Sequence, residues 1–198
     1  MANLKTSKTY VNLAKAYAGE CQARTRYEFL EYGARKGGLV AMANVIDKIV
    51  YNEFNHARML YTFIQTADSG TIDNIDIATG YPFKEKWSIL DNLRLASEDE
   101  ADEADRIYPE YAKIAEKEGF KDIAGLFTNL STVEAAHKML FSELHEQLKN
   151  NTMYKKAKKV AWRCGDCGFE LTAEDAPPEC PLCQAKQGSY LIKTQMML

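Results

Sequence analysis

The sequence lacks the features that would direct a protein to a membrane, to export or to nucleic acid. No apolar run in its 198 residues approaches the roughly 18 residues that a membrane-spanning helix needs. The first ten residues, MANLKTSKTY, contain no apolar segment of a secretory signal, so we expect a cytoplasmic protein. A formal net charge of −3 gives no general reason to expect a nucleic-acid partner.

Cysteine and histidine are scarce, and where they occur they are grouped. Five cysteines in a cytoplasmic chain are expected to be thiols or metal ligands rather than disulfides. Four of them lie close together near the C-terminus, and two of the three histidines follow a glutamate by three positions. This grouping points to metal sites.

Apolar residues, by contrast, are abundant and follow a helical period. Hydrophobic residues make up 46% of the chain, and four stretches carry them at steps of three and four, as on a helix that faces a bundle core. Each stripe is interrupted near its middle by side chains of metal-ligand type. In chain order these are Glu20; Glu53 and His56; Glu100 and Glu103; and Glu134 and His137.

The helix boundaries predict two antiparallel pairs. We expect helices over residues 7–36, 39–67, 87–117 and 121–149, with a long connection over 68–86 that joins the pairs across the bundle. Gly37 and Gly38 together, and Gly119 alone, are the predicted breaks within each pair. Pro109 should bend the third helix or loosen one of its backbone bonds.

The inward carboxylates require a counter-charge. A buried carboxylate costs several kcal/mol or more unless it is paired, neutralised or bound to metal. Five together repel one another, whereas two divalent cations would nearly balance them. Carboxylate and imidazole ligands suit Fe(II) or Mn(II). One Glu from each of two helices and Glu-x-x-His from each of the other two is the known arrangement of ferritin-like di-iron proteins.

For several residues near this set more than one role is open. Glu103 exceeds the minimal six ligands and is an extra ligand, a proton donor or an exposed side chain. Tyr27 either orients a ligand carboxylate or packs in the core, as does Tyr108. Cys21 is expected to be an inert thiol and His145 a surface or core residue. The remaining acids of the segment from Ser97 to Arg106 are expected to face solvent; they are Glu98, Asp99, Asp102 and Asp105.

A second, smaller domain is predicted after the bundle. We expect residues 1–149 to form the bundle and residues 150–160 a basic linker, which is either solvated or docked to an acidic partner. Residues 161–198 form a domain that is too short to fold on apolar burial alone. Two C-x-x-C pairs, Cys164/Cys167 and Cys180/Cys183, predict a four-thiolate metal site. The spacing favours zinc somewhat; a redox-active di-metal site, which needs an electron source, favours iron.

Together these motifs resemble the rubrerythrin family over nearly the whole length. The resemblance implies a mainly α protein: a ferritin-like four-helix bundle with a small C-terminal rubredoxin-like metal-knuckle domain. It rests on a combination of short motifs rather than on any single one. They are Glu20, Glu53-x-x-His56, Glu100-x-x-Glu103 with Tyr108-Pro109, Glu134-x-x-His137, Trp162 and the two cysteine pairs, the second of them Cys-Pro-x-Cys.

The resemblance also implies roles. Glu53 and Glu134 would bridge two irons, with Glu20 on one iron and Glu100 and His137 on the other. Glu103 and His56 would exchange on the first iron with redox state. The cysteines would hold a single iron, which zinc can replace in recombinant protein. One departure is Gln184, where many such knuckles have glycine; this could reshape the loop.

The activity implied is reduction of hydrogen peroxide to water as a defence against oxidative stress. Electrons would pass from a donor, such as an NAD(P)H-dependent reductase or small redox protein, through the single iron to the di-iron site, usually across a homodimer. The alternatives left open are a ferroxidase or iron-storage protein, a zinc-ribbon interaction protein on a structural bundle, and an oxygenase.

Overall fold

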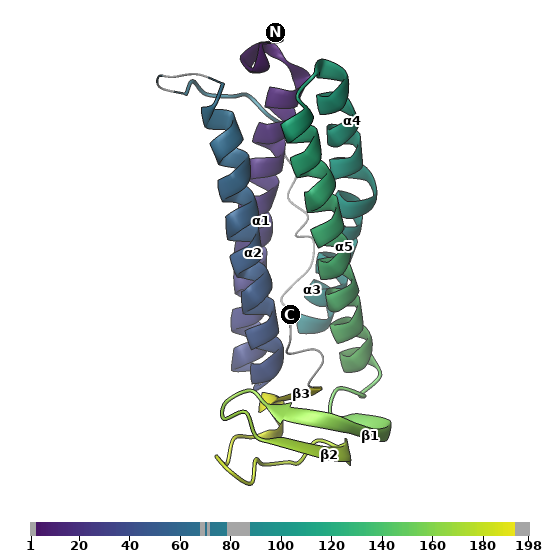
Figure 1. The fold of residues 1–198 in the computed structure, drawn as a ribbon. Helices are drawn as coiled ribbons and strands as arrows, with labels where there is room; N and C mark the ends of the chain where they lie inside the picture. Colours follow the sequence, from purple (N-terminus) through teal and green to yellow (C-terminus); the bar gives the residue numbers. More distant parts are fainter. Residues whose placement is uncertain (1–2, 68–69, 71, 79–87, 193–198) are drawn as a thin grey trace.

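The computed structural model describes residues 3–67, 70, 72–78 and 88–192, which form a four-helix bundle with a small sheet at one end (Figure 1). The first helix pair is α1, Lys8–Lys36, and α2, Val40–Gln65. The second pair is a segmented rod followed by α5, Lys121–Lys149. The sheet consists of β1, Lys155–Cys164, β2, Glu170–Asp175, and β3, Tyr190–Ile192. Short 3-10 helices η1, Leu4–Thr6, and η3, Gln187–Ser189, complete the description.

The helix boundaries follow local signals in the sequence. Ser7 caps α1, since its hydroxyl accepts a hydrogen bond from the Tyr10 amide at 3.1 Å. Gly38, with φ +78°, makes the turn into α2. Gly119, with φ +88°, ends the second rod in the left-handed conformation that glycine adopts without a steric penalty. The two breaks predicted from glycine are therefore confirmed.

The third predicted helix is divided into three segments. It consists of α3, Ile89–Asp102, a π turn η2, Glu103–Ile107, and α4, Tyr108–Glu118. The amide of Tyr108 donates to the carbonyl of Glu103, five residues back, which widens the turn. Pro109 follows directly and has no N–H to donate. The break in the helix that this proline predicts is therefore found in the turn that precedes it. The predicted start at Trp87 lies outside the described residues, as do 68–69, 71 and 79–86 of the predicted connection.

The apolar core is divided in two by a polar layer. One cluster, which includes Met42, Ile46 and Phe141, lies toward the sheet. The other, which includes Leu13, Leu60 and Phe127, lies toward the N-terminal end. Between them the four stripes carry buried Glu and His side chains at one level of the bundle. No helix in the part of the chain that the structure describes is long and apolar enough to cross a membrane.

The sheet begins earlier than the composition suggests. Its order is β2-β1-β3, and both pairs are antiparallel. In β1, Lys155 pairs with Asp175 and Val160 with Ala173, so residues 155–160, predicted as linker, form a strand. A row of lysines gives no strand period in the sequence; backbone pairing with β2 orders this segment instead.

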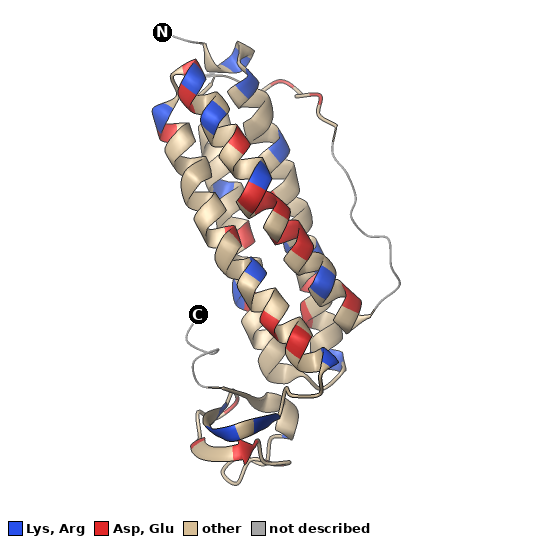
Figure 2. Cartoon of the chain, turned by 90° about the vertical axis from the view of Figure 1, so that its right-hand side faces the viewer, with Lys and Arg blue, Asp and Glu red and all other residues tan. Residues whose placement is uncertain are grey.

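The sheet packs directly against the bundle. Met153 and Leu191 are buried in the same apolar cluster as Met42 and Leu144. Gly188 lies against the turn between α1 and α2, where a Cβ on it would fall 1.6 Å from the Gly38 carbonyl oxygen. The C-terminal sheet therefore sits at the end of the bundle where α1 turns into α2 (Figure 1), and Figure 2 shows it beyond that end from a second side.

Candidate metal centres

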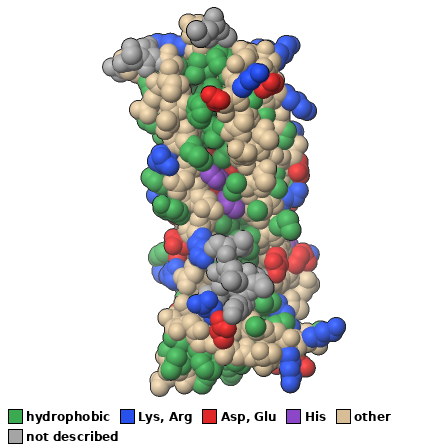
Figure 3. Space-filling view, viewed as in Figure 1, with side chains coloured by type: hydrophobic (Ala, Val, Ile, Leu, Met, Phe, Trp, Pro, Cys, Tyr) green, Lys and Arg blue, Asp and Glu red, His purple; other side chains and the backbone are tan. Residues whose placement is uncertain are grey.

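The structure brings six of the predicted side chains together in the middle of the bundle. Ligand atoms of Glu20, Glu53, His56 and Glu134 lie within 4.8 Å of one another, and so do those of Glu53, Glu100, Glu134 and His137. All six residues are buried. Glu53 and Glu134 belong to both groups, so either carboxylate can reach two ions at once. In the space-filling view of Figure 3, small parts of histidine side chains are visible midway along the bundle, with hydrophobic side chains nearby.

The two groups have nearly the same geometry. His56 Nδ1 lies 2.9 Å from Glu53 Oε2 and 3.1 Å from Glu134 Oε1. His137 Nδ1 lies 2.8 Å from Glu134 Oε2 and 3.0 Å from Glu53 Oε1. The antiparallel helix pairs are thus related by an approximate two-fold axis across the bundle. The imidazole rings are stacked, with centroids 5.9 Å apart.

Two buried tyrosines cross between the helix pairs. Tyr27 of α1 donates a 2.5 Å hydrogen bond to Oε1 of Glu100 in the second pair. Tyr108 donates a short hydrogen bond to Oε1 of Glu20 in the first pair. Each phenol therefore orients a carboxylate of the opposite helix pair. Of the two roles considered for Tyr27 and Tyr108, the orientation of a ligand carboxylate is the one that fits.

The pKa shifts in the cluster follow from burial and from its dense negative charge. Burial, followed by repulsion from neighbouring carboxylates, raises the pKa of Glu100 well above its usual value. Burial also raises the pKa of Glu20, although His56 opposes it. Burial opposes charge on Glu53 too, but the two imidazoles lower the pKa of Glu53 to about 2. Burial would lower the pKa of His137, but Glu134 and Glu53 raise it to about 9.

The cluster passes a direct test of fit for metal ions. Among the described residues, nine buried side-chain nitrogen and oxygen atoms lack a hydrogen bond, and six of them belong to this cluster. Several lie within ion-pair distance of an imidazole nitrogen but are not aligned for a hydrogen bond. Such atoms are costly to bury without a partner. Four carboxylates and two imidazoles directed at two positions suit two divalent cations with oxygen and nitrogen ligands.

Glu103 lies beside the cluster but outside both groups of four. Its Oε1 ends 3.6 Å from the place that a Cβ on Gly19 would take, on the side of Glu20. Burial and the charges of Glu20, Glu134 and Glu53 raise its pKa well above the usual value. A carboxyl group held there lies beside the metal ligands, and its raised pKa favours the protonated form. It can therefore act as a spare ligand or as a proton donor.

In the second rod, the other acids between Ser97 and Arg106 are exposed, as predicted, with one exception. Glu98, Asp102 and Asp105 are exposed, and Figure 2 shows acidic residues following one another along this rod. Asp99, predicted to face solvent, is instead half-buried and pairs with Arg26 of α1 at 3.1 Å. The prediction for Asp99 is wrong because an arginine from another helix compensates its charge, which the sequence of one helix cannot reveal.

Sequence reasoning also missed Asn52. Its amide nitrogen lies 3.2 Å from Nε2 of His137, on the side of the ring that faces away from the carboxylates. Position 52 lies directly before Glu53 and off the apolar stripe, so no periodic signal marks it. Of the remaining residues, Cys21 is half-buried, and His145 lies beside Glu146 at 3.2 Å, away from the cluster.

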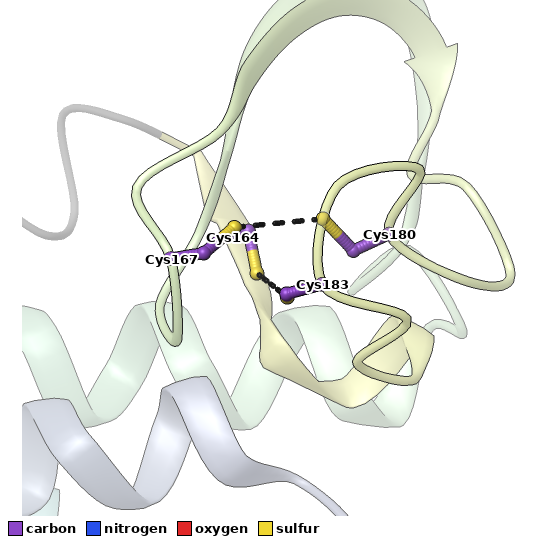
Figure 4. A group of neighbouring side chains, drawn as sticks. All are labelled: Cys164, Cys167, Cys180 and Cys183. Carbon is purple, nitrogen blue, oxygen red and sulfur yellow. Dashed lines mark hydrogen bonds between the residues drawn. The ribbon is translucent and has the colours of Figure 1, made fainter.

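The four C-terminal cysteines converge from two loops (Figure 4). The Sγ atoms of Cys164 and Cys183 are 3.8 Å apart, and those of Cys167 and Cys180 are 3.6 Å apart. A tetrahedron with metal–sulfur bonds of about 2.3 Å has edges of about 3.8 Å, so the thiols are spaced for one ion. Burial would raise the pKa of Cys180, but the nearby Tyr190 hydroxyl and backbone amides lower it to about 6.

The two cysteine loops have equivalent backbones despite their different sequences. Gly168, after the first pair, has φ +78°, and Gln184, after the second, has φ +63°. The amides of Gly168 and Gln184 donate to the carbonyls of Cys164 and Cys180, both at 2.9 Å. Gln184 therefore keeps the left-handed turn without glycine, and the loop is not reshaped as its sequence suggested.

These features define a class of protein: a ferritin-like four-helix bundle with a carboxylate and histidine di-iron site, joined to a rubredoxin-like knuckle of four cysteines. Comparison with known proteins agrees over both parts. The family model for rubrerythrin matches residues 12–145 and 91–163. The model for the rubredoxin-like domain of rubrerythrin matches residues 162–190.

Two relatives are similar over almost their full length. A rubrerythrin of Clostridium perfringens is 37% identical over 190 residues, which are 96% of each chain. A rubrerythrin of Porphyromonas gingivalis is 33% identical over 188 residues, which are 95% of this chain and 91% of the relative. The chain belongs to the rubrerythrin family, which assigns it to the di-iron oxidoreductases of oxidative-stress defence.

Solved structures support the same fold. A mixed-valence state of nigerythrin matches with a TM-score of 0.62 at 22% identity, covering 97% of this chain and 94% of nigerythrin. A bacterioferritin of Desulfovibrio desulfuricans matches with a TM-score of 0.61 at 20% identity, over 73% of this chain and 82% of its own. The match to bacterioferritin covers a smaller share of the chain than the match to nigerythrin.

Proposed function

We propose that the protein reduces hydrogen peroxide to water, with electrons delivered through an iron bound by Cys164, Cys167, Cys180 and Cys183. The observation that carries the proposal is the presence of two four-residue groups sharing Glu53 and Glu134 in a chain that also holds a four-thiolate site. Six residues would hold the di-iron pair: Glu20, Glu53, His56, Glu100, Glu134 and His137. Bound there, two ferrous ions would supply both electrons that cleavage of an O–O bond needs.

The protein's own side chains position the metal ligands and supply protons to the reaction. Reduction of one peroxide to two waters consumes two electrons and two protons. Glu103, beside the cluster and with a raised pKa, is the group suited to hold a proton near departing hydroxide. Tyr27 keeps Glu100 oriented through its 2.5 Å hydrogen bond. The apolar clusters on either side of the site keep most of its surroundings free of bulk water.

The electron path favours a homodimer. Within one chain the sheet domain sits at the end of the bundle where α1 turns into α2. The thirteen helical steps of α2 from Val40 to Glu53 span about 20 Å at 1.5 Å per residue. A partner chain whose cysteine domain approaches this cluster would shorten that distance. An NAD(P)H-dependent reductase or small redox protein would then reduce the exposed side of the cysteine site, where Cys167 and Cys183 reach solvent.

Iron analysis and rapid mixing test the proposal. We expect three irons per chain in protein loaded anaerobically and purified, and re-oxidation of the reduced protein by peroxide within the mixing time, faster than by dioxygen. Glu53→Gln, which removes a carboxylate shared by both groups, should abolish this re-oxidation. Cys167→Ser should leave a single re-oxidation intact but stop steady-state turnover, because only the electron supply is lost.

Other outcomes would contradict it. Faster re-oxidation by dioxygen, with many irons accumulated per chain, would identify a ferroxidase or storage protein. Colourless protein that takes up only zinc at both sites, even when iron is offered anaerobically, would identify a structural bundle with a zinc ribbon.

A further inference from the structure

The approximate two-fold symmetry of the cluster is broken at two positions. The axis relates Glu53 and His56 of α2 to Glu134 and His137 of α5, so each residue of one helix pair has a counterpart in the other. Glu103, three residues after Glu100, has Ala23 as its counterpart, three residues after Glu20. Asn52, directly before Glu53, has Val133 as its counterpart, directly before Glu134.

The second difference changes how the two imidazoles are held. His137 has contacts on both ring nitrogens: Nδ1 faces Glu53 and Glu134, and Nε2 faces the amide of Asn52 at 3.2 Å. His56 has carboxylates at Nδ1, but among the residues that the structure describes none forms a hydrogen bond with its Nε2. Val133, at the equivalent place, has no polar side-chain atom with which to form one.

This difference matters once Nδ1 binds a metal ion. A neutral imidazole that binds metal through Nδ1 carries its proton on Nε2 and needs an acceptor there. If the Asn52 side-chain amide rotates by half a turn about its Cβ–Cγ bond, its Oδ1 takes the place of the nitrogen and accepts that proton. The hydrogen bond then fixes both the tautomer and the plane of the His137 ring. Among the described residues, the ring of His56 has no such hydrogen bond at Nε2.

We propose that Asn52 is a positioning residue that makes His137 the permanent imidazole ligand, and that valine at the equivalent position 133 leaves His56 free to depart. The spare carboxylate, Glu103, lies on the side of Glu20 and therefore beside the group that contains His56. Both departures from symmetry thus act together: one group has a fixed ligand set, and the other has an unanchored imidazole with a replacement beside it. This inference rests on the proposed di-metal function.

Zinc-loaded protein allows a test that does not depend on activity. Ring nitrogen NMR of the diamagnetic zinc form reports the tautomer of each histidine and the rate at which its Nε2 proton exchanges with water. In the wild-type protein we expect slow exchange at His137 and rapid exchange at His56. Asn52→Val should speed the exchange at His137 about 10-fold or more, and weaken ferrous-iron affinity by about 10–100-fold, the usual effect of losing such a partner.

Three further variants separate positioning from a general structural effect. Asn52→Asp keeps an acceptor and should preserve slow exchange and affinity. Asn55→Val is the matched control, since the side chain of Asn55 forms its hydrogen bonds with Tyr51 and Arg58 of the same helix. Val133→Asn supplies the missing acceptor and should slow exchange at His56.

The possible failures are distinguishable. If the wild-type protein binds no pair of metal ions in the bundle, the proposed function fails. If it binds two ions but Asn52→Val leaves the His137 proton protected and the affinity unchanged, the role assigned to Asn52 is overturned. Rapid exchange at His56 in Val133→Asn would overturn the role assigned to position 133.

Discussion

At the scale of single residues, the cluster is a set of acids and bases that need one another or a metal. In the metal-free protein, protonated His137 compensates Glu53 and Glu134, so its pKa rises to about 9, while burial raises the pKa values of Glu20 and Glu100. Each of these shifts means that the folded state binds protons more tightly than the unfolded state. Such contributions favour folding at low pH and weaken as pH rises.

The stability of the metal-free protein and the extra stability that metal adds should therefore change with pH in opposite directions. The stabilisation from His137 is complete below about pH 6.5 and is lost as pH rises through about 9, so its contribution to the free energy of unfolding of metal-free protein should fall by about 3 kcal/mol. The neighbouring glutamates also raise the pKa of His56, although burial opposes them, so His56 adds to the fall in the same direction. Burial favours the neutral form of Glu53, but the two imidazoles lower its pKa to about 2, so Glu53 adds no slope there. Ligand deprotonation instead tightens metal binding, so added ferrous iron should stabilise more at higher pH.

Urea unfolding at several pH values, with chelator or with anaerobic ferrous iron, measures both slopes. Glu53→Gln in the presence of iron is the control, and it should lose the metal-dependent stabilisation. A metal-free protein that becomes more stable between pH 6.5 and 9 would contradict the assigned protonation of the cluster.

At the scale of elements, the π turn η2 accounts for a one-residue difference between the two halves. Glu20 and Tyr27 are seven residues apart, whereas Glu100 and Tyr108 are eight apart with η2 between them. Two α turns hold about seven residues, and a π turn holds one more. The wider turn therefore lets Tyr108 reach Glu20 as Tyr27 reaches Glu100.

The π turn and Pro109 together change which backbone amides and carbonyls are hydrogen-bonded along the rod. The amide of Tyr108 bonds to Glu103 rather than to Ala104, and Pro109 has no N–H to offer. The hydroxyl of Ser131 on α5 supplies a donor to the Ala104 carbonyl at 2.8 Å. The irregular segment is thus tied to the helix that carries Glu134 and His137.

Ser131→Ala should destabilise the metal-free protein by about 1–3 kcal/mol, because the Ala104 carbonyl would lose its donor in a largely buried place. Chemical denaturation followed by far-UV circular dichroism measures the change. Ser142→Ala on the same helix is the matched control, since its hydroxyl contacts Ser97 at the exposed surface, and it should shift stability by less than about 0.5 kcal/mol. Equal effects of the two variants would mean that Ser131 does not support the π turn.

At the scale of the whole molecule, the cysteine domain is docked on its own bundle through a close backbone contact. Gly188 of η3 lies against the Gly38 carbonyl, and Met153 and Leu191 add apolar contact with the bundle. No larger residue fits at position 188 while the two parts remain in place. The relative position of the two centres within one chain therefore depends on this glycine.

Gly188→Ala should release the cysteine domain from the bundle end, because the added Cβ would lie 1.6 Å from the Gly38 oxygen. We expect a larger radius of gyration in small-angle scattering and faster proteolysis near Asn151, with metal binding at both centres retained. Gly125→Ala, in α5, is the control, since a Cβ there would meet nothing within 4 Å. Unchanged scattering and proteolysis of Gly188→Ala would show that the contact does not hold the domains together.

The sequence by itself determined the kinds of side chain and their spacing along each helix. The apolar period predicted four rods, glycine predicted their breaks, and the positions of Glu20, Glu53, Glu100, Glu134 and the two histidines on those stripes predicted one polar layer. The cysteine spacing predicted a compact thiolate cluster. These properties are local, because a helix with 3.6 residues per turn fixes which residues share a face.

Only the tertiary structure decided which side chains meet across helices. The rotation and register of one helix against another bring Tyr27 to Glu100, Asn52 to His137 and Arg26 to Asp99, and they leave Glu103 just outside the two groups. Pairing with β2 likewise turned the lysine-rich segment at 155–160 into a strand. Such contacts join residues far apart in the chain, and no period along one helix encodes them.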